Sequence, residues 1–332
     1  MADKKRVVAL AFSDLHINDW SKFNKDNERT LNHFKVLSHL VSKANKYDCP
    51  VLFCGDLLHK AESISNNLFA TLQYEMVHMY GDWGLYKSEL WAISGNHDMP
   101  SANTKEHPSN SWVAILSNYY KFLECIDWQS RETEYIKVWG IPYLDHNIGL
   151  NEAVKAIEVD PNKKNILLLH TDYPGAKDTD GVEVGTVENL NTNLLSKFDL
   201  VLIGHIHKPQ RLSKKVYMVG APLQQRRTDR NCDMGYLKIY EDMTVKFVNL
   251  SEKFPKFIDV EKEEDIKDDG NYYTVVGAKK ALEEETQKEN RITQRLSKKR
   301  LVRRYMKARG IKDDKKQEVL LKVLKEAGDD NI

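Results

Sequence analysis

Five short apolar stretches in this chain each end in residues that can bind a metal ion, and this pattern constrains the fold more than any other. Residues 90–93 are apolar and are followed by Ser94-Gly95-Asn96-His97-Asp98. A short apolar stretch that ends at a glycine indicates a buried strand and a sharp turn. The other four stretches end in Asp14-Leu15-His16, Gly55-Asp56-Leu57-Leu58-His59, Leu169-His170 and Gly204-His205-Ile206-His207. Because open α/β sheets carry their chemistry at strand ends, we predict that these five ends surround a metal centre.

The first third of the chain alternates strand and helix patterns. Residues 7–12 are almost wholly apolar and predict a central strand that is buried on both faces. An amphipathic helix is predicted over 28–46, a strand over 51–54, a second helix over 65–80 and a strand over 90–93. This alternation predicts a parallel sheet with helices outside it.

The middle of the chain predicts further strands. A helix is expected over 109–123. Strands are expected over 135–139, 165–169, 200–203, 216–219, 235–240 and 244–249. We expect the last three to be antiparallel, with Gly220-Ala221-Pro222 as the turn between the first two. The loop over 171–186 receives no assignment.

The composition changes after about residue 251, which suggests three segments: 1–250, 251–277 and 278–332. The second segment contains two predicted strands, 257–260 and 272–276, around an acidic stretch. The third has a helical pattern. Its residues 288–309 include ten Lys or Arg and one Glu, with an approximate apolar stripe.

The overall composition limits the classes of function. The formal net charge is +1, so any nucleic-acid surface must be local. The four cysteines form no Cys-x-x-Cys pair, which predicts reduced thiols in a cytoplasmic protein. The N-terminal apolar stretch is too short for a signal peptide, and no stretch reaches membrane-spanning length. We therefore expect no membrane association.

If the five strand ends converge, their residues divide between two metal ions. Asp14, His16 and His207 would bind the first ion. Asn96, His170 and His205 would bind the second ion. The carboxylate of Asp56 would bridge the two ions. Mixed His, Asp and Asn ligands favour manganese, with magnesium, iron or zinc as alternatives. A structural zinc site would be closed and rich in Cys. Paired metal ions activate water and support in-line phosphoryl transfer.

Two histidines remain beside this ligand set. His97 follows Asn96, and we expect Asp98 to orient it and favour its protonated form, as a general acid requires. His59 would contact the scissile phosphate or stabilise the transition state. Any one of these motifs alone is more simply explained as a polar turn, but the five in this order are not. His33, His39, His78, His107 and His146 are interpreted as surface or packing residues.

The ordered motifs resemble those of the calcineurin-like metallophosphoesterase superfamily, over residues 7–250. Within it the chain is most similar to the SbcD-type DNA nuclease subunit. Gly55-Asp56-Leu57-Leu58-His59 ends in His, where protein Ser/Thr phosphatases carry Asp followed by Arg-Gly. Gly95-Asn96-His97-Asp98 ends in Asp, where those phosphatases carry Glu. Gly220-Ala221-Pro222-Leu223-Gln224 resembles the turn that follows the last ligand strand of these nucleases.

The resemblance implies an α/β fold: a β-sandwich flanked by helices, with a small cap-like α+β region and a C-terminal helical tail. It implies that the seven ligands bind two manganese ions, that His97 acts on the leaving group and that His59 assists at the phosphate. The implied protein is a DNA exonuclease or endonuclease. It would form a homodimer within a heterotetramer, with an SbcC-type ATPase that binds the tail through its coiled coil. A phage-encoded version would act in the host cytoplasm.

Two alternative functions remain open. One is a small-molecule phosphodiesterase or phosphatase of the same superfamily, for which the basic tail would have no use. The other is a non-catalytic docking protein, for which a complete ligand set would be unnecessary.

Overall fold

The computed structural model describes residues 5–80, 88–100, 110–184 and 190–276. The predicted helices after residue 278, with the basic stretch 288–309, lie outside the described residues. The chain divides into two compact units. The first comprises Met1–Ile258 and Gly270–Tyr272, and the second comprises Asp259–Asp269 and Tyr273–Ile332. The predicted three-segment division stays a prediction.

The first sheet of unit 1 has the strand order β12-β11-β1-β2-β3-β4. Its strands are β1 (Val7–Phe12), β2 (Val51–Phe53), β3 (Leu90–Ala92), β4 (Leu123–Cys125), β11 (Gly235–Tyr240) and β12 (Val245–Asn249). β1 to β4 are parallel, as the strand–helix alternation predicted, whereas β11 pairs antiparallel with β1. The predicted helix over 109–123 was too long. Within the described residues 111–123, α3 (Trp112–Ser117) is the helical part, because the chain then turns and becomes extended to pair β4 with β3.

The second sheet has the order β5-β6-β7-β8-β10-β9. Its strands are β5 (Ser130–Glu132), β6 (Ile136–Ile141), β7 (Lys164–His170), β8 (Leu200–Gly204), β9 (Gln210–Arg211) and β10 (Val216–Met218). The prediction that β10 is antiparallel to β11 was wrong. β10 pairs parallel with β8, and the segment 220–222 connects the two sheets rather than forming a hairpin turn.

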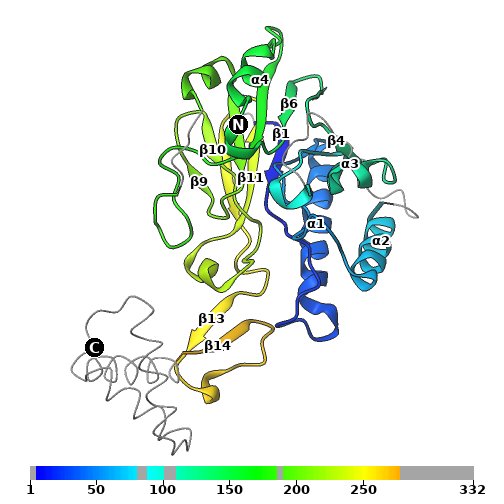
Figure 1. The fold of residues 1–332 in the computed structure, drawn as a ribbon, viewed down its shortest axis with the longest axis vertical. Helices are drawn as coiled ribbons and strands as arrows, with labels where there is room; N and C mark the ends of the chain where they lie inside the picture. The colour runs from blue at the N-terminus through cyan, green and yellow to red at the C-terminus, as the bar shows by residue number, and fades with distance from the viewer. Residues whose placement is uncertain (1–4, 81–87, 101–109, 185–189, 277–332) are drawn as a thin grey trace, which may run out of the picture. The chain divides into compact units, whose positions relative to one another are not determined.

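The two sheets pack face to face and helices cover their outer faces. Alternate residues of a strand point to opposite sides, so Leu52 joins the core between the sheets while Phe53 joins the core beneath the helices. α1 (Glu28–Tyr47), α2 (Asn66–Tyr80) and α3 cover the first sheet, as Figure 1 shows. α4 (Leu150–Ala156) packs on the second sheet. This architecture confirms the predicted helix-flanked sandwich.

The remaining described elements are short. β13 (Phe257–Val260) and β14 (Tyr272–Val275) form a two-stranded sheet, as predicted from their sequences. The 3₁₀ helices are η1 (Lys25–Asn27), η2 (Asn96–Asp98), η4 (Asp145–Asn147), η5 (Thr192–Lys197), η6 (Arg227–Asn231) and η7 (Glu263–Asp265). Among the described helices, none combines the length and the apolar character that crossing a membrane requires. The four cysteines are free thiols.

Candidate metal centre

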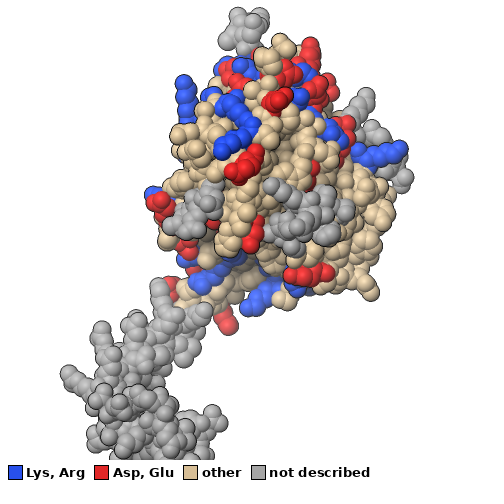
Figure 2. Space-filling view, turned by 45° about the horizontal axis from the view of Figure 1, so that its top comes forward, with Lys and Arg blue, Asp and Glu red and all other residues tan. Residues whose placement is uncertain are grey.

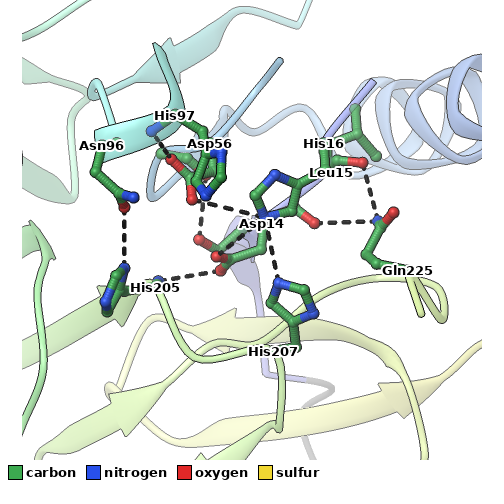
Figure 3. Close-up of polar contacts among 12 residues, drawn as sticks. Asp14, Leu15, His16, Asp56, Asn96, His97, His205, His207 and Gln225 are labelled. Atoms are coloured by element: carbon green, nitrogen blue, oxygen red, sulfur yellow. Dashed lines mark hydrogen bonds and ion pairs between the residues drawn. The ribbon is translucent and has the colours of Figure 1, made fainter. Parts of the chain in front are cut away.

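The structure brings all seven predicted ligands together at the carboxyl ends of β1, β2, β3, β7 and β8, and Figure 3 shows most of them. One set of ligand atoms, which we call the first group, lies within 4.8 Å: Asp14, His16 and His207. Another set, Asp56, His170 and His205, also lies within 4.8 Å. The side chain of Asn96 contacts both His170 and His205, so we call Asn96, His170 and His205 the second group.

In the first group, two imidazole nitrogens face one another. His207 Nδ1 lies 3.3 Å from Asp229 Oδ2, so it carries the ring hydrogen and Nε2 keeps a lone pair. That Nε2 atom lies 3.2 Å from His16 Nε2. Burial lowers the pKa of His16 well below its usual value, so its ring is neutral. Asp14 Oδ1 is buried and has no hydrogen-bond partner in the described residues. Two imidazole nitrogens that face one another and a carboxylate oxygen without a hydrogen bond suit a cation.

The second group also combines imidazole nitrogens with oxygen acceptors. His170 Nδ1 donates to the carbonyl of Cys54 at 2.6 Å, so Nε2 is the atom that faces the site. It lies 3.0 Å from Asn96 Oδ1 and 3.3 Å from Asp56 Oδ2, which are both acceptors. Burial opposes a charge on this ring, but Asp56 outweighs burial and raises the pKa of His170 to about 9. This position therefore favours positive charge.

Asp56 lies between the two groups. Its Oδ2 atom is 3.6 Å from His16 Nε2 and 3.3 Å from His170 Nε2. Burial alone would raise its pKa, but the neighbouring His170 and His16 lower it, so the carboxyl group stays ionised. One carboxylate facing both groups fits the predicted bridging position, and the donor set as a whole fits two divalent ions.

The local backbone is strained where it presents these ligands. Asp14, His16, Asp56 and His205 have positive φ angles of 52°, 49°, 64° and 102°. Such conformations cost on the order of 1–3 kcal/mol each, and four of them together at one place indicate a backbone that the surrounding structure holds in position. Two of the motifs require glycine because a side chain would collide with the proposed ligands. A Cβ atom at Gly95 would lie 2.1 Å from Asp56 Oδ1, and one at Gly55 (φ 96°) would lie 2.4 Å from His170 Nδ1.

Asp98 has a different position from the one we predicted. It does not orient the ring of His97, because its buried carboxylate accepts hydrogen bonds from four backbone amides: Asp56, Leu57, Leu58 and Gly95. It thereby fastens the turn that carries Asn96 to the turn that carries Asp56. Its contribution to the site is positional.

His97 is oriented by His59 instead. His97 Nδ1 donates to the carbonyl oxygen of His59 at 2.8 Å, and the two rings stack with an interplanar angle of 13°. The backbone amide of His97 donates to Asp56 Oδ1 at 2.8 Å. Because Nδ1 is occupied by its hydrogen bond to His59, Nε2 is the atom of the His97 ring that remains to act on a bound substrate. Burial and the neighbouring His97 lower the pKa of His59 to about 4.

Three supporting residues were missed by sequence reasoning. Asp229 holds His207, and Asp172 Oδ1 lies 3.6 Å from His205 Nε2. Gln225 donates through Nε2 to the carbonyls of Asp14 and Leu15, as Figure 3 shows. Gln225 and Asp229 follow no predicted strand closely, so the strand-end pattern does not include them. Asp172 comes two residues after β7, as Asp14 does after β1, but it lies in the loop 171–186 that received no assignment.

The histidines that were interpreted as ordinary lie elsewhere or support packing. His33 is buried and contacts Gln225 Oε1 through Nε2, and burial lowers the pKa of His33 to about 4. His39, His78 and His146 belong to none of the groups of potential ligands, and His107 lies outside the described residues.

Comparison with known proteins gives a family match and one informative relative. The model of the family described as calcineurin-like phosphoesterase matches residues 8–209. The SbcD component of the nuclease SbcCD from Staphylococcus epidermidis is 32% identical over 211 residues, which are 56% of this chain and 54% of the relative. The chain thus matches about half the length of that protein.

The solved structure of a dimetal phosphatase from Danio rerio is also similar. It covers 71% of this chain and 93% of its own, with a TM-score of 0.43 and 10% identity. This likeness is too weak to assign a ligand or a reaction to the present chain.

Proposed function

Because the chain belongs to the calcineurin-like phosphoesterase family, we propose that it is a two-metal-dependent DNA phosphodiesterase with exonuclease or endonuclease activity. The observation that carries this proposal is the pair of ligand groups joined by Asp56, with His97 beside them. The choice of DNA is supported by the match to a component of the SbcCD nuclease. It is also supported by His59, which occupies the position that distinguishes these nucleases from the Ser/Thr phosphatases.

We assign the residues as follows. The metal ligands are Asp14, His16, Asp56, Asn96, His170, His205 and His207. His97 donates a proton from Nε2 to the leaving oxygen, because its Nδ1 hydrogen is already held by the carbonyl of His59. His59 positions His97 through that carbonyl and its stacked ring. When bound, paired divalent ions supply activation of water and neutralise charge on the phosphate.

Manganese is the proposed metal. Four of the seven proposed ligands are imidazoles, which suit borderline ions better than magnesium, an ion that prefers oxygen. Protein stripped of metal should regain far more activity with Mn²⁺ than with Mg²⁺. Full activity with Mg²⁺ alone would contradict this assignment.

A nuclease assay tests the function. Purified protein with Mn²⁺ should cleave single- or double-stranded DNA, and the His97→Ala variant should not. Hydrolysis of small phosphate esters without any cleavage of DNA would indicate a small-molecule phosphodiesterase. Inactivity on both, with two metals bound, would indicate a docking protein.

The proposed partners are DNA and an SbcC-type ATPase with a coiled coil, in an assembly that contains two copies of this chain. On the face drawn in Figure 2, acidic and basic side chains are interspersed, so the general charge of unit 1 offers no broad DNA-binding surface there. Residues 288–309 are the most basic stretch of the sequence. Deleting 278–332 should abolish co-purification with the ATPase while leaving Mn²⁺-dependent cleavage of short single strands nearly intact. A truncated protein that still co-purifies would place the docking surface elsewhere.

A further inference from the structure

Unit 1 contains a cavity that is separate from the proposed ligand set. It is a cavity of about 550 Å³ that is lined by residues of β9, β10, β11 and β12. This volume is within the range of pockets that bind small molecules, about 300–1,000 Å³. None of its lining residues belongs to the proposed ligand set.

The floor of the cavity is aromatic and apolar. Tyr217, Leu237, Val245 and Phe247 line it, and all four also belong to or pack against the core between the two sheets. The rings of Tyr217 and Phe247 are half-buried, so each keeps part of its surface open. Two aromatic rings at the open end of an apolar core offer flat surfaces on which another ring can stack.

The rim of the cavity is polar and carries positive charge. Lys208 and Arg211 line it, and the guanidinium of Arg211 lies 5.6 Å from the centre of the Tyr217 ring. Asn231 and Asp233 add an amide and a carboxylate, which are groups that pair with the edges of bases. A positive rim around an aromatic floor is the combination that binds nucleotides of single strands.

The chain connects this cavity directly to the metal centre. Lys208 follows the ligand His207, and consecutive Cα atoms are about 3.8 Å apart. Residues 231–233, on another wall, follow η6, which contains the Asp229 that holds His207. The walls of the cavity are therefore continuous in sequence with His207 and with the segment that holds it.

The segment 226–230, which leads from the support of His207 to the cavity wall at residues 231–233, also carries cationic side chains. It contains Arg226, Arg227 and Arg230, and its one carboxylate, Asp229, is buried against His207. The side chain of Arg226 is 62% exposed. Its Nε atom lies 3.6 Å from Asp229 Oδ1, and an exposed arginine in this segment is suited to bind a phosphate of the strand.

We propose that this cavity binds one unpaired base of the DNA strand, next to the phosphate that is cleaved, while Arg226 and Lys208 contact the flanking phosphates. The inference rests on the proposed nuclease function and names the form of the substrate. A base that stacks on Tyr217 and Phe247 must be outside a duplex, because a paired base is already stacked on both faces. The enzyme should accordingly prefer single strands and frayed ends.

The test compares three substrates: a single-stranded oligonucleotide, the same strand with one abasic residue next to the cleaved phosphate, and bis(p-nitrophenyl) phosphate. Loss of the base should lower kcat/KM of the wild type about tenfold, within the range that one stacked base contributes. Tyr217→Ala and Phe247→Ala should each lose a similar factor on the intact strand. They should lose little more on the abasic strand, because the two changes remove the same contact.

Matched variants separate stacking from folding. Tyr217→Phe keeps the ring and should retain wild-type cleavage of the intact strand. Tyr119→Ala removes a ring that is 72% exposed and outside the cavity, and it should change nothing. All four variants should cleave the abasic strand at about the wild-type rate, because that substrate has no base to place in the cavity.

Each failure has a distinct meaning. Equal cleavage of the intact and abasic strands by the wild type overturns the base-binding proposal and leaves the nuclease proposal standing. A Tyr217→Ala variant that slows cleavage of the abasic strand as much as cleavage of the intact strand also overturns it, since the ring would then act through the fold. A wild type that hydrolyses bis(p-nitrophenyl) phosphate but no DNA overturns both proposals.

Discussion

The two ligand groups are supported in different ways. In the first group, His207 is held by Asp229, whose carboxyl group is fully buried. In the second group, His205 faces Asp172, whose side chain is 41% exposed, across 3.6 Å. Both histidines follow β8 in the same motif, Gly204-His205-Ile206-His207, so the sequence alone does not distinguish how firmly each is held.

The support of the first group extends further into the protein. Asp229 Oδ2 also accepts hydrogen bonds from the amides of Gln225 and Arg226. Gln225 in turn binds the carbonyls of Asp14 and Leu15, so one buried residue joins the strand end after β1 to the segment that holds His207. In the second group, the imidazole of His170 is held by a buried hydrogen bond to the carbonyl of Cys54. The imidazole of His205 faces the partly exposed carboxylate of Asp172 instead.

This difference suggests that the two metal positions are not equivalent. Residues that orient a ligand typically contribute about 10–100-fold to metal affinity, and buried contacts contribute most because water does not compete with them. We expect the first group to hold its ion tightly and the second group to exchange its ion more readily. Four variants, taken from the largest expected effect to the smallest, test this expectation.

Asp56→Ala should have the largest effect, because Asp56 faces both groups. The variant should lose metal from both positions, and its activity should fall by more than the ~10⁴-fold that general acid–base catalysis contributes at most. Metal content of the purified protein measures this. Asp145→Ala, at an exposed aspartate outside the ligand groups, is the control and should keep both ions. Retention of two ions by Asp56→Ala would show that it does not bridge.

His97→Ala should separate catalysis from metal binding. Its ring is not assigned as a ligand, so both ions should stay, while cleavage of DNA falls by about 10²–10⁴-fold. Hydrolysis of bis(p-nitrophenyl) phosphate should fall much less, because p-nitrophenolate leaves without needing a proton. His78→Ala, at an exposed histidine of α2, serves as the control. A His97→Ala protein without metal would mean that the ring is a ligand.

Asp229→Asn tests the buried support of the first group. The variant keeps the shape of the side chain but removes the charge that steadies His207, so the tighter Mn²⁺ site should weaken by about 10–100-fold. Titration of metal-free protein with Mn²⁺, followed by electron paramagnetic resonance, reports the two affinities separately. Asp265→Asn, on an exposed turn, should leave both unchanged. A selective change in the weaker site would reverse our assignment of the groups.

Sequence patterns predicted the strands, and the side chains that the structure brings together at their ends, because both depend on local features. β1, β2, β3, β7 and β8 are continuous apolar stretches, and each ends in a polar motif. The partner of a strand depends instead on distant residues. Nothing within residues 216–219 distinguishes a strand that pairs with β8 from one that pairs with β11, and the extended form of β4 depends on its contact with β3.

The supporting residues escaped prediction for a related reason. Asp98 stands beside His97 in sequence, which suggested a direct interaction, yet its carboxylate faces the amides of a turn about 40 residues away. Asp229 stands in a segment of arginines that has no strand pattern. Adjacency in sequence is thus a poor guide to which carboxylate supports which histidine, because the turns at the strand ends reverse the chain.

Asp172→Asn should have the smallest effect and gives the sharpest test of the comparison. Asp172→Asn makes the same change beside His205 that Asp229→Asn makes beside His207, because both replace a carboxylate with an amide. The carboxylate of Asp172 is half-exposed, however, so water can replace it. Interactions between exposed groups are worth little, so the weaker Mn²⁺ site should lose less than about tenfold in affinity. The same Mn²⁺ titration measures it, with Asp145→Asn as the exposed control. An effect as large as that of Asp229→Asn would show that burial of the supporting carboxylate does not distinguish the two groups.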